Sequence, residues 1–365
     1  MRVLVAGDWH SSIHEEPVKI ALVEQGHECV PFAWHTYFRS GAPGPAGALS
    51  GRLLRAQNAW LYGPAIARLN RDLVVLARRA QPDAVLVYRG THVWGSTLRK
   101  LRTVVPGAPI VGLNNDNPFS ELNPPLLWRH FLAAIPAYDL ILAYREGDIP
   151  QYRAHGARDV RLFRSWFLPW LHHPFELGAA DREKYECEVV FAGHYEPDGR
   201  KEQLEAIIRA GHRLKLFGPG WEKPAAQSPW LRQFTPVISP RDVEYCKALR
   251  GAKIALCYLS KLNRDTYTRR CFEIPALGTM LLSEYTDDLA TMFDAGAEAD
   301  FFRTDAELLE KLAFYLSNDD ERRRVARGGR DRVVRDGHDV FSRVRELISS
   351  FDELRGSRVA ARGRA

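Results

Sequence analysis

The sequence predicts an α/β protein built from two Rossmann-like domains in tandem. Short apolar runs alternate with helical segments, which is the pattern of parallel sheets. The runs form two series, separated by a segment rich in Pro, Trp and His at about 166–185. A chain of 365 residues is also long enough for two domains. We expect one domain over 1–170, a second over 186–345, and a helix end with a basic tail over 346–365.

The first series predicts a β-α-β opening followed by three more buried strands. A Gly/Pro/Ala-rich stretch within it reads as a loop, and a long periodic stretch as a helix. In chain order we expect strand 2–7, helix 16–25, strand 28–32, loop 41–51, helix 53–80, and strands 84–88, 110–113 and 140–143 with helices between them.

The second series repeats the alternation and ends in helices. In chain order we expect strand 188–192, helix 201–210, strand 214–217, helix 240–249, strand 253–258, helix 272–277, strand 280–282, and helices 306–316 and 320–336. Two such domains place the carboxyl ends of their strands at a shared cleft, where ligands of α/β proteins bind.

The composition excludes several classes of protein. The hydrophobic fraction is 45% and the charged fraction 26%, as in ordinary globular proteins. The five cysteines are scattered without a Cys-x-x-Cys pair, so we expect neither a disulfide framework nor a structural zinc site. We see no signal peptide and no apolar run of about 18 residues. We therefore expect a cytoplasmic protein.

The net charge of +6 comes mostly from arginines late in the chain. The run 322–332 is typical of a solvated helix face, and the tail 356–365 of a frayed end. Nucleic-acid binding would need aromatic residues between the basic ones, and these are missing, so we expect no nucleic-acid partner. Loose contact with an anionic membrane is compatible with the charge, although no amphipathic anchor is clear.

The most informative segment runs from Thr268 to Glu284. It reads as a helix start with Arg269, Arg270 and Glu273, then a glycine turn and a buried strand. Arginine can bind a diphosphate through paired hydrogen bonds, and a carboxylate one helical turn away can accept hydrogen bonds from ribose hydroxyls. The alternative is a surface ion pair between Arg269 and Glu273. The apolar residues after Glu273 favour a buried carboxylate, which needs a partner.

This segment resembles the C-terminal part of group-1 glycosyltransferases, in particular the CgeB-type spore-protein branch. The resembling features are Thr268-x-Arg-x-Phe-Glu-x-Pro-Ala-x-Gly278, Leu-Leu-Ser-Glu284, Phe293-x-x-Gly-x-Glu298, and Ala326-x-x-Gly-x-x-Arg-Val333 with His338. The resemblance is strongest over 187–345. It implies the GT-B fold, in which two Rossmann-like domains face a cleft and the C-terminal domain holds the sugar nucleotide.

The resemblance also implies roles for individual residues. The family pattern is Glu-x7-Glu, and Glu273 fits the second position, which binds ribose. Asp265 stands at the first position, near the donor sugar, and departs from the pattern. Thr268, Arg269 and Arg270 would complete this side of the donor site. A strand–glycine–cation loop would approach the diphosphate through Gly193, His194, Arg200 and Lys201, although it also fits an ordinary loop. The turn Gly218-Pro-Gly220 reads most simply as a turn.

Polar loops also follow the strands of the first domain. Asp8, His10 and Asp116 are candidates for a catalytic base, with helix capping and loop packing as the alternative. The pair His172-His173 has no carboxylate or cysteine at ligand spacing, so we read it as structural. No Asp-x-Asp metal motif stands on a suitable element, and the resemblance implies a metal-independent reaction.

We therefore predict a glycosyltransferase that moves a sugar from a nucleotide-diphosphate donor to a hydroxyl acceptor, without a cofactor. The resemblance suggests retention of configuration and surface glycan or glycoconjugate synthesis. The acceptor is open between a glycan, a lipid-linked saccharide and a protein. The alternatives are a sugar-nucleotide epimerase or phosphorylase-like enzyme on the same fold, and a non-catalytic nucleotide-binding protein.

Overall fold

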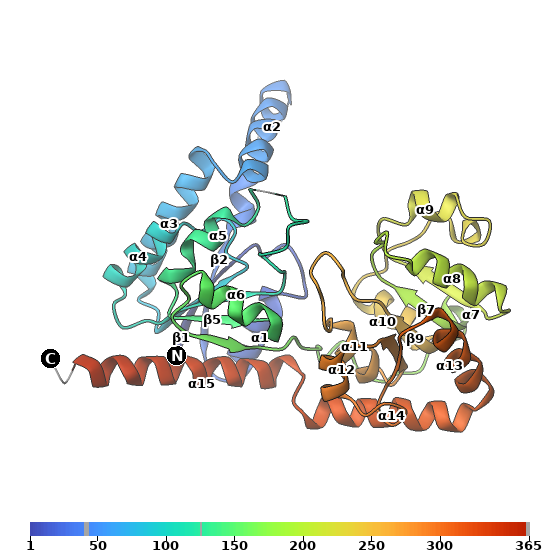
Figure 1. Cartoon of the computed structure of the whole chain (residues 1–365). Coiled ribbons are helices and arrows are strands. Elements are labelled where there is room, and N and C mark those ends of the chain that lie inside the picture. The colour runs from blue at the N-terminus through green and yellow to red at the C-terminus, as the bar shows by residue number, and fades with distance from the viewer. Residues whose placement is uncertain (40–43, 125, 363–365) are drawn as a thin grey trace. The chain divides into compact units, whose positions relative to one another are not determined.

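The computed structural model describes residues 1–39, 44–124 and 126–362, which form two compact units (Figure 1). The first unit comprises residues 1–164 together with the helix that begins at Val340. The second unit is Ser165–Asp339. Each unit is a parallel sheet flanked by helices, as the two sequence series predict.

The described part of the first unit contains a six-stranded parallel sheet in the order β2-β1-β3-β4-β5-β6. Its strands are β1 (Arg2–Gly7), β2 (Glu28–Ala33), β3 (Ala84–Tyr88), β4 (Ile110–Asn114), β5 (Leu140–Ala143) and β6 (Val160–Leu162). Its helices are α1 (Glu15–Glu24), α2 (Gly44–Trp60), α3 (Pro64–Ala80), α4 (Gly95–Val104), α5 (Arg129–Ala134), α6 (Ile149–Ala154) and α15 (Val340–Arg362).

The strand order reverses between β1 and β3. Ala6 pairs with Val87, so Gly7 and Tyr88 end these strands at the same edge of the sheet. Residues of β3, β4 and β5 are buried throughout, because helices cover both faces. The loops after β1 and β3 therefore diverge at the point where α/β sheets bind ligands.

The described part of the second unit contains a five-stranded parallel sheet in the order β11-β10-β9-β7-β8. Its strands are β7 (Cys187–Ala192), β8 (Leu214–Phe217), β9 (Ala252–Cys257), β10 (Met280–Glu284) and β11 (Asp300–Phe302). Its helices are α7 (Ala179–Tyr185), α8 (Arg200–Arg209), α9 (Glu222–Ala226), α10 (Asp242–Arg250), α11 (Arg270–Ala276), α12 (Asp287–Met292), α13 (Asp305–Ser317) and α14 (Asp319–Arg335).

In this sheet the strand order reverses between β7 and β9, where Phe191 pairs with Leu256. Two glycines let the chain pass closely at this edge. Gly218 has φ +125°, and a Cβ there would lie 2.1 Å from the carbonyl oxygen of Gly193. The Gly218 turn is thus a required close approach of two backbones.

The expected elements are present, with differences in the first unit and at unpredicted short elements. The stretch expected as a loop at 41–51 is helical from Gly44, and 41–43 lie outside the described residues. The single helix expected at 53–80 is two helices, since Leu61 and Gly63 have positive φ and separate α2 from α3. The short strands β6 and β11 and the short helices α7, α9 and α12 were not predicted.

The C-terminal region also differs from the prediction. The tail expected to fray continues as helix α15 to Arg362. This helix packs on α1 of the first unit, and Gln25 donates to the carbonyl oxygen of Phe341 at 2.9 Å. Residues 340–345, which we expected in the second domain, therefore belong to the first unit. Residues 165–170, which we expected in the first domain, and the connecting segment 171–185 lie in the second unit.

Candidate functional site

Arg270 lies at the reversal point of the second sheet. Its Nη2 donates to the carbonyl oxygen of Tyr258, the residue after β9, at 3.2 Å. A Cβ on Gly193, after β7, would lie 3.3 Å from its Nη1. The Nε atom is buried and has no acceptor among the described residues. A partly exposed guanidinium with a buried, unused Nε donor fits a site where an anion binds.

Glu273 lies one turn along α11 and is 5% exposed. Its Oε2 accepts a hydrogen bond from the Tyr245 hydroxyl at 3.0 Å. Burial and the Glu273 carboxylate raise the pKa of Tyr245 well above its usual value, so this hydroxyl stays protonated and donates. Because the Glu273 carboxylate is buried, it does not form the exposed ion pair with Arg269 that was the alternative interpretation.

His172 faces the other oxygen of this carboxylate. Its Nε2 lies 3.9 Å from Oε1 of Glu273. Its Nδ1 accepts from the backbone N–H of Leu168 at 2.9 Å, so the neutral ring carries its proton on Nε2. Burial lowers the pKa of His172. The separation exceeds a hydrogen bond, so Glu273 Oε1 keeps capacity for a ligand hydroxyl.

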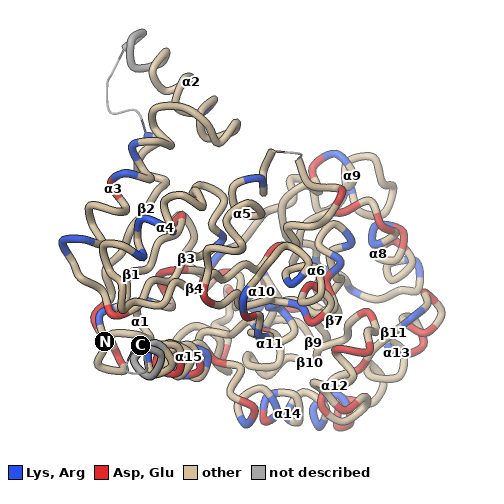
Figure 2. The backbone as a smooth tube through the Cα atoms, turned by 60° about the vertical axis from the view of Figure 1, so that its left-hand side comes forward, with Lys and Arg blue, Asp and Glu red and all other residues tan. Residues whose placement is uncertain are grey.

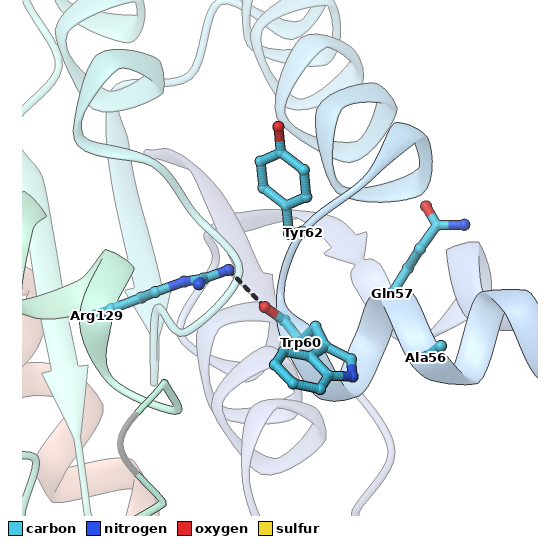
Figure 3. A pocket seen from close by; sticks show the side chains of 5 residues that line it. All are labelled: Ala56, Gln57, Trp60, Tyr62 and Arg129. Carbon is cyan, nitrogen blue, oxygen red and sulfur yellow. Dashed lines mark hydrogen bonds between the residues drawn. The ribbon is translucent and has the colours of Figure 1, made fainter.

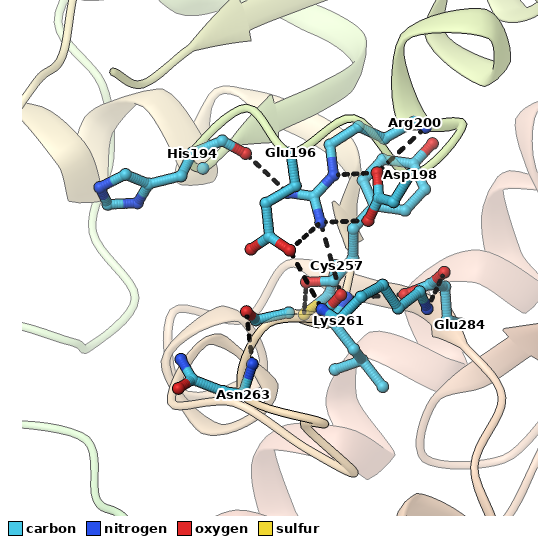
Figure 4. A network of polar contacts seen from close by, with 12 residues as sticks. His194, Glu196, Asp198, Arg200, Cys257, Lys261, Asn263 and Glu284 are labelled. Carbon is cyan, nitrogen blue, oxygen red and sulfur yellow. Dashed lines mark hydrogen bonds and ion pairs between the residues drawn. The ribbon is translucent and has the colours of Figure 1, made fainter. Parts of the chain in front are cut away.

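Arg200 occupies a different environment, in the polar network drawn in Figure 4. It is 3% exposed, and Asp198 receives two hydrogen bonds from it, Nε to Oδ1 at 2.8 Å and Nη2 to Oδ2 at 2.6 Å. Its Nη1 donates to the carbonyl oxygen of His194 at 2.6 Å. The guanidinium therefore holds the loop after β7 in place. A role as a diphosphate ligand stays a prediction, which this geometry does not favour.

The same network joins three loops at the carboxyl edge. The backbone N–H of Leu259 donates to Glu284 at 2.6 Å, and Glu284 pairs with Lys261 at 2.9 Å. The backbone N–H of Lys261 donates to Glu196 at 3.0 Å. The loops after β7, β9 and β10 are thus fixed to one another (Figure 4).

The remaining predicted residues of the second unit lie around this edge. Burial, and then the Arg270 guanidinium, lower the pKa of His194, whose ring points away from the Arg200 network in Figure 4. Lys201 pairs with Glu205 on its own helix at 2.9 Å. Arg269 is buried with its guanidinium over the ring of Trp166 at 5.4 Å.

Asp265 and Thr268 belong to the loop between β9 and α11, and both are partly buried. The backbone N–H of Asp265 donates to the carbonyl oxygen of Ser260 at 2.9 Å. The carbonyl oxygen of Thr268 accepts from Cys271 at 2.9 Å. Their proposed contacts with the donor sugar remain predictions.

In the first unit, Asp8 and His10 follow β1 as expected. The backbone N–H of Asp8 donates to Oε1 of Glu15 at 2.8 Å, and its carbonyl oxygen accepts from His35. Glu15 is 2% exposed, and burial raises its pKa. His10 is exposed, with its ring centroid 6.4 Å from that of His35.

Asp116 follows β4 and forms an ion pair with Arg89 at 3.1 Å. Between these loops, the Tyr88 hydroxyl contacts Nδ1 of His14 at 3.1 Å and accepts from Asn115 at 2.6 Å. A group of polar side chains thus lies beyond β1, β3 and β4 of the first sheet.

Sequence reasoning missed Glu15, Tyr245 and His172 as site residues. In the sequence Glu15 resembles an ordinary acidic residue in the first turn of α1. Nothing in the sequence shows that its carboxylate accepts a hydrogen bond from the loop after β1. His172 and Tyr245 are 101 and 28 residues from Glu273, so only the fold brings them together. The doublet His172-His173 was the one visible signal.

Within residues 1–39, 44–124 and 126–362, no group of three or more His, Cys, Asp or Glu side chains lies together as a metal site. None of the described helices is both long enough and apolar enough to span a bilayer.

Comparison with known protein families gives one match, over part of the chain. Residues 200–349 match the model of a family described as glycosyl transferase-like. The matched segment is less than half of the chain and contains Arg270 and Glu273. No curated protein sequence matches the chain.

Solved structures share the whole fold at low sequence identity. Anabaena HepE, in complex with UDP and glucose, is 12% identical with a TM-score of 0.65, over 97% of this chain and 100% of that one. Sucrose-phosphate synthase from Thermosynechococcus elongatus is 12% identical with a TM-score of 0.68, over 98% and 100%. A putative UDP-N-acetylglucosamine 2-epimerase from Listeria monocytogenes is 13% identical with a TM-score of 0.54, over 95% and 94%.

The predicted fold class, two Rossmann-like domains as in GT-B proteins, is therefore confirmed. The resemblance to group-1 glycosyltransferases is confirmed at the level of the family match and the fold. The CgeB-like branch stays a prediction.

Proposed function

We propose that this protein is a glycosyltransferase that moves a sugar from a nucleotide-diphosphate donor to a hydroxyl acceptor. The observation that carries the proposal is Arg270 at the reversal point of the second sheet, with a buried Nε donor that has no acceptor among the described residues. Support also comes from the family match over 200–349 and from the UDP complexes of the similar protein HepE.

The donor would be held by the second unit. Arg270 would bind the diphosphate, and Glu273 would accept ribose hydroxyls while Tyr245 holds its other oxygen. Negative charge grows on the leaving phosphate as the glycosidic bond breaks. A preorganised guanidinium stabilises that charge in the transition state more than in the ground state, which accelerates transfer. His194, whose pKa is lowered by burial and then by Arg270, would line the same side of the site as a neutral imidazole.

The acceptor would be held by the first unit, and this assignment is an expectation from the resemblance. Asp8, His10 and Asp116 remain the proposed candidates for a base if the reaction inverts configuration. Asp116 would first have to be released from its ion pair with Arg89. We propose retention, no metal ion and no organic cofactor, a cytoplasmic location, and a glycan, lipid-linked or protein acceptor in glycoconjugate synthesis.

A thermal-shift screen of the whole chain against nucleoside diphosphates tests the donor site. A ligand at about 100 times its Kd should stabilise the second unit by roughly 2.7 kcal/mol. Arg270→Ala and Glu273→Gln should lose this shift, because each removes one contact with the ligand. Glu273→Gln keeps an oxygen for the Tyr245 hydroxyl, so its stability without ligand should change little.

Arg323→Ala is the matched control, because Arg323 lies on α14 with a side chain 63% exposed. It should keep the full shift. If both site variants respond to nucleotide as the wild type does, the assignment of the donor site is wrong.

The second candidate is a sugar-nucleotide epimerase, which the shared fold of the putative Listeria epimerase keeps open. The two activities differ in their need for an acceptor. Product analysis with and without an acceptor separates them: an epimerase converts the donor sugar alone, whereas a transferase releases the nucleoside diphosphate as it forms a glycoside.

A further inference from the structure

Helix α2 exposes large apolar side chains along one face. Leu49, Leu53, Ala56 and Trp60 follow at intervals of four, three and four residues, which places them on one side of a helix. Leu49, Leu53 and Trp60 are 60%, 57% and 63% exposed, and Tyr62, just after the helix, is 72% exposed. We call Leu49, Leu53, Trp60 and Tyr62 the α2 ridge. A contiguous exposed row of this kind is unusual for a surface that only meets water.

The polar residues of α2 hold it against its own unit. Oδ1 of Asn58 lies 2.7 Å from Nε2 of His92. Oε1 of Gln57 accepts from the backbone N–H of Ala65 at 2.7 Å. These two contacts fix the rotation of α2 about its axis, with the side chains of Leu49, Leu53 and Trp60 exposed. Because satisfied hydrogen bonds fix this orientation, the ridge cannot turn inward without breaking them.

The sequence around α2 is rich in arginine, although Arg68 and Arg71 contact Asp72 at 3.6 and 3.2 Å. No Asp or Glu occurs between Glu28 and Asp72, whereas this stretch contains five arginines: Arg39, Arg52, Arg55, Arg68 and Arg71. Arg52 and Arg55 are exposed and lie on α2 itself. Figure 2 shows the distribution of charged residues along the chain. The charge complements an anionic partner and would repel a second copy of the same face.

A hollow of about 370 Å³ adjoins the C-terminal end of the ridge (Figure 3). It is lined by Ala56, Gln57, Trp60, Tyr62 and Arg129. Arg129 donates to the carbonyl oxygen of Trp60 at 2.5 Å, so it fixes the end of α2 and brings a further cation to the hollow. Aromatic side chains beside a cation are typical of the boundary between lipid headgroups and acyl chains.

We propose that the α2 ridge docks the first unit on the surface of an anionic lipid bilayer. The leucines and Trp60 enter the boundary between headgroups and acyl chains, and Arg52 and Arg55 lie at the level of the lipid phosphates. This contact is independent of the proposed reaction. The sequence alone did not reveal it, because part of α2 reads as a loop.

Flotation of the full-length protein with lipid vesicles tests the proposal. We expect binding to phosphatidylcholine vesicles that contain about one third phosphatidylglycerol, weak binding to pure phosphatidylcholine, and release by salt. Arg52→Ala and Arg55→Ala should each weaken binding about fivefold. Leu53→Glu and Trp60→Ser should each weaken it by about tenfold or more, since they remove inserted apolar area.

The matched controls are Val334→Glu and Trp230→Ser, at positions 54% and 40% exposed on the second unit. They should bind vesicles as the wild type does. The thermal shift with nucleoside diphosphate serves as a separate readout, so loss of vesicle binding alone leaves the proposed reaction standing.

Two results would overturn the proposal. One is that anionic vesicles fail to bind the wild type, or bind the ridge variants equally well. The other is a dimer by light scattering that Leu53→Glu dissociates, which would assign the ridge to a second copy of the chain.

Discussion

The imidazole of His92 is a partly buried titratable group whose surroundings disfavour its charged form. Its ring stacks on Trp34 at 5.3 Å, and burial, Arg89 and His130 lower its pKa to about 3. In the unfolded chain a histidine titrates near pH 6.5. The unfolded state therefore binds the proton first, so stability is full above about pH 6.5 and falls as the pH drops toward 3.

We predict that, because of His92, the free energy of unfolding of the first unit is about 2 kcal/mol lower at pH 5 than at pH 7.5. In His92→Gln, whose amide can still donate to Asn58, the loss of unfolding free energy between these pH values should be smaller by about that amount. Urea unfolding at both pH values measures it. His212→Gln, at a partly exposed position of the second unit, is the control; an equal pH dependence in wild type and His92→Gln would contradict the prediction.

The sequence predicted which loops carry the charged residues, but not which arginine keeps N–H donors without an acceptor. Arg200 and Arg270 look alike as cations at helix starts. In the structure Asp198 engages Arg200 through two oxygens, whereas Arg270 keeps a buried Nε without an acceptor among the described residues. Such pairing depends on side-chain directions after folding, which no spacing in the sequence encodes.

The turn after β8 lies close to the backbone at the end of β7. We predict that Gly218→Ala destabilises the second unit far more than Gly199→Ala. Both positions have positive φ, +125° and +97°, so each alanine costs about 1 kcal/mol of backbone strain. At Gly199 an added Cβ meets nothing within 4 Å, whereas at Gly218 it would lie 2.1 Å from a backbone oxygen.

That overlap should add roughly 1–3 kcal/mol to the cost at Gly218. Because the displaced oxygen belongs to Gly193, beside Arg270, Gly218→Ala should also weaken the thermal shift with nucleoside diphosphate. Chemical unfolding of the two variants measures the difference. Equal losses of stability would mean that the backbones do not approach as closely as the structure has them.

Sequence periodicity identified most strands and helices, because buried parallel strands and amphipathic helices leave strong patterns. It failed at α2, where Gly and Pro near Gly44 suggested a loop and the apolar residues point to solvent. It also missed β6 and β11, three-residue strands with too few positions to show a pattern.

For the whole molecule, the sequence predicted two domains but not that the chain returns to the first one. Buried Val344, Leu347 and Phe351 show the spacing of a helix with one apolar face. This pattern indicates that α15 packs on something, without indicating on which unit. The partners, α1 and the loop residue Asp83, lie hundreds of residues away in sequence.

We predict that the first unit needs α15 for its stability. A chain ended after Asp339 loses the burial of Val344, Leu347 and Phe351, worth up to about 2 kcal/mol each. It also loses the ion pairs Arg161–Glu353 and Arg355–Asp83. The sum is comparable to the whole stability of a typical domain, so the first unit should melt far lower or not fold. A chain ended after Gly356 keeps these contacts and should melt like the full-length protein.

Calorimetry of the three chains separates the two units, because the truncation at Asp339 keeps all of Ser165–Asp339, including His338, stacked on Phe272 at 4.1 Å. The transition that shifts with nucleoside diphosphate should therefore persist, while the other transition is lost. If both transitions fall together, the second unit depends on the first for its fold. If neither moves, α15 covers the first unit without stabilising it, and its apolar face has another role.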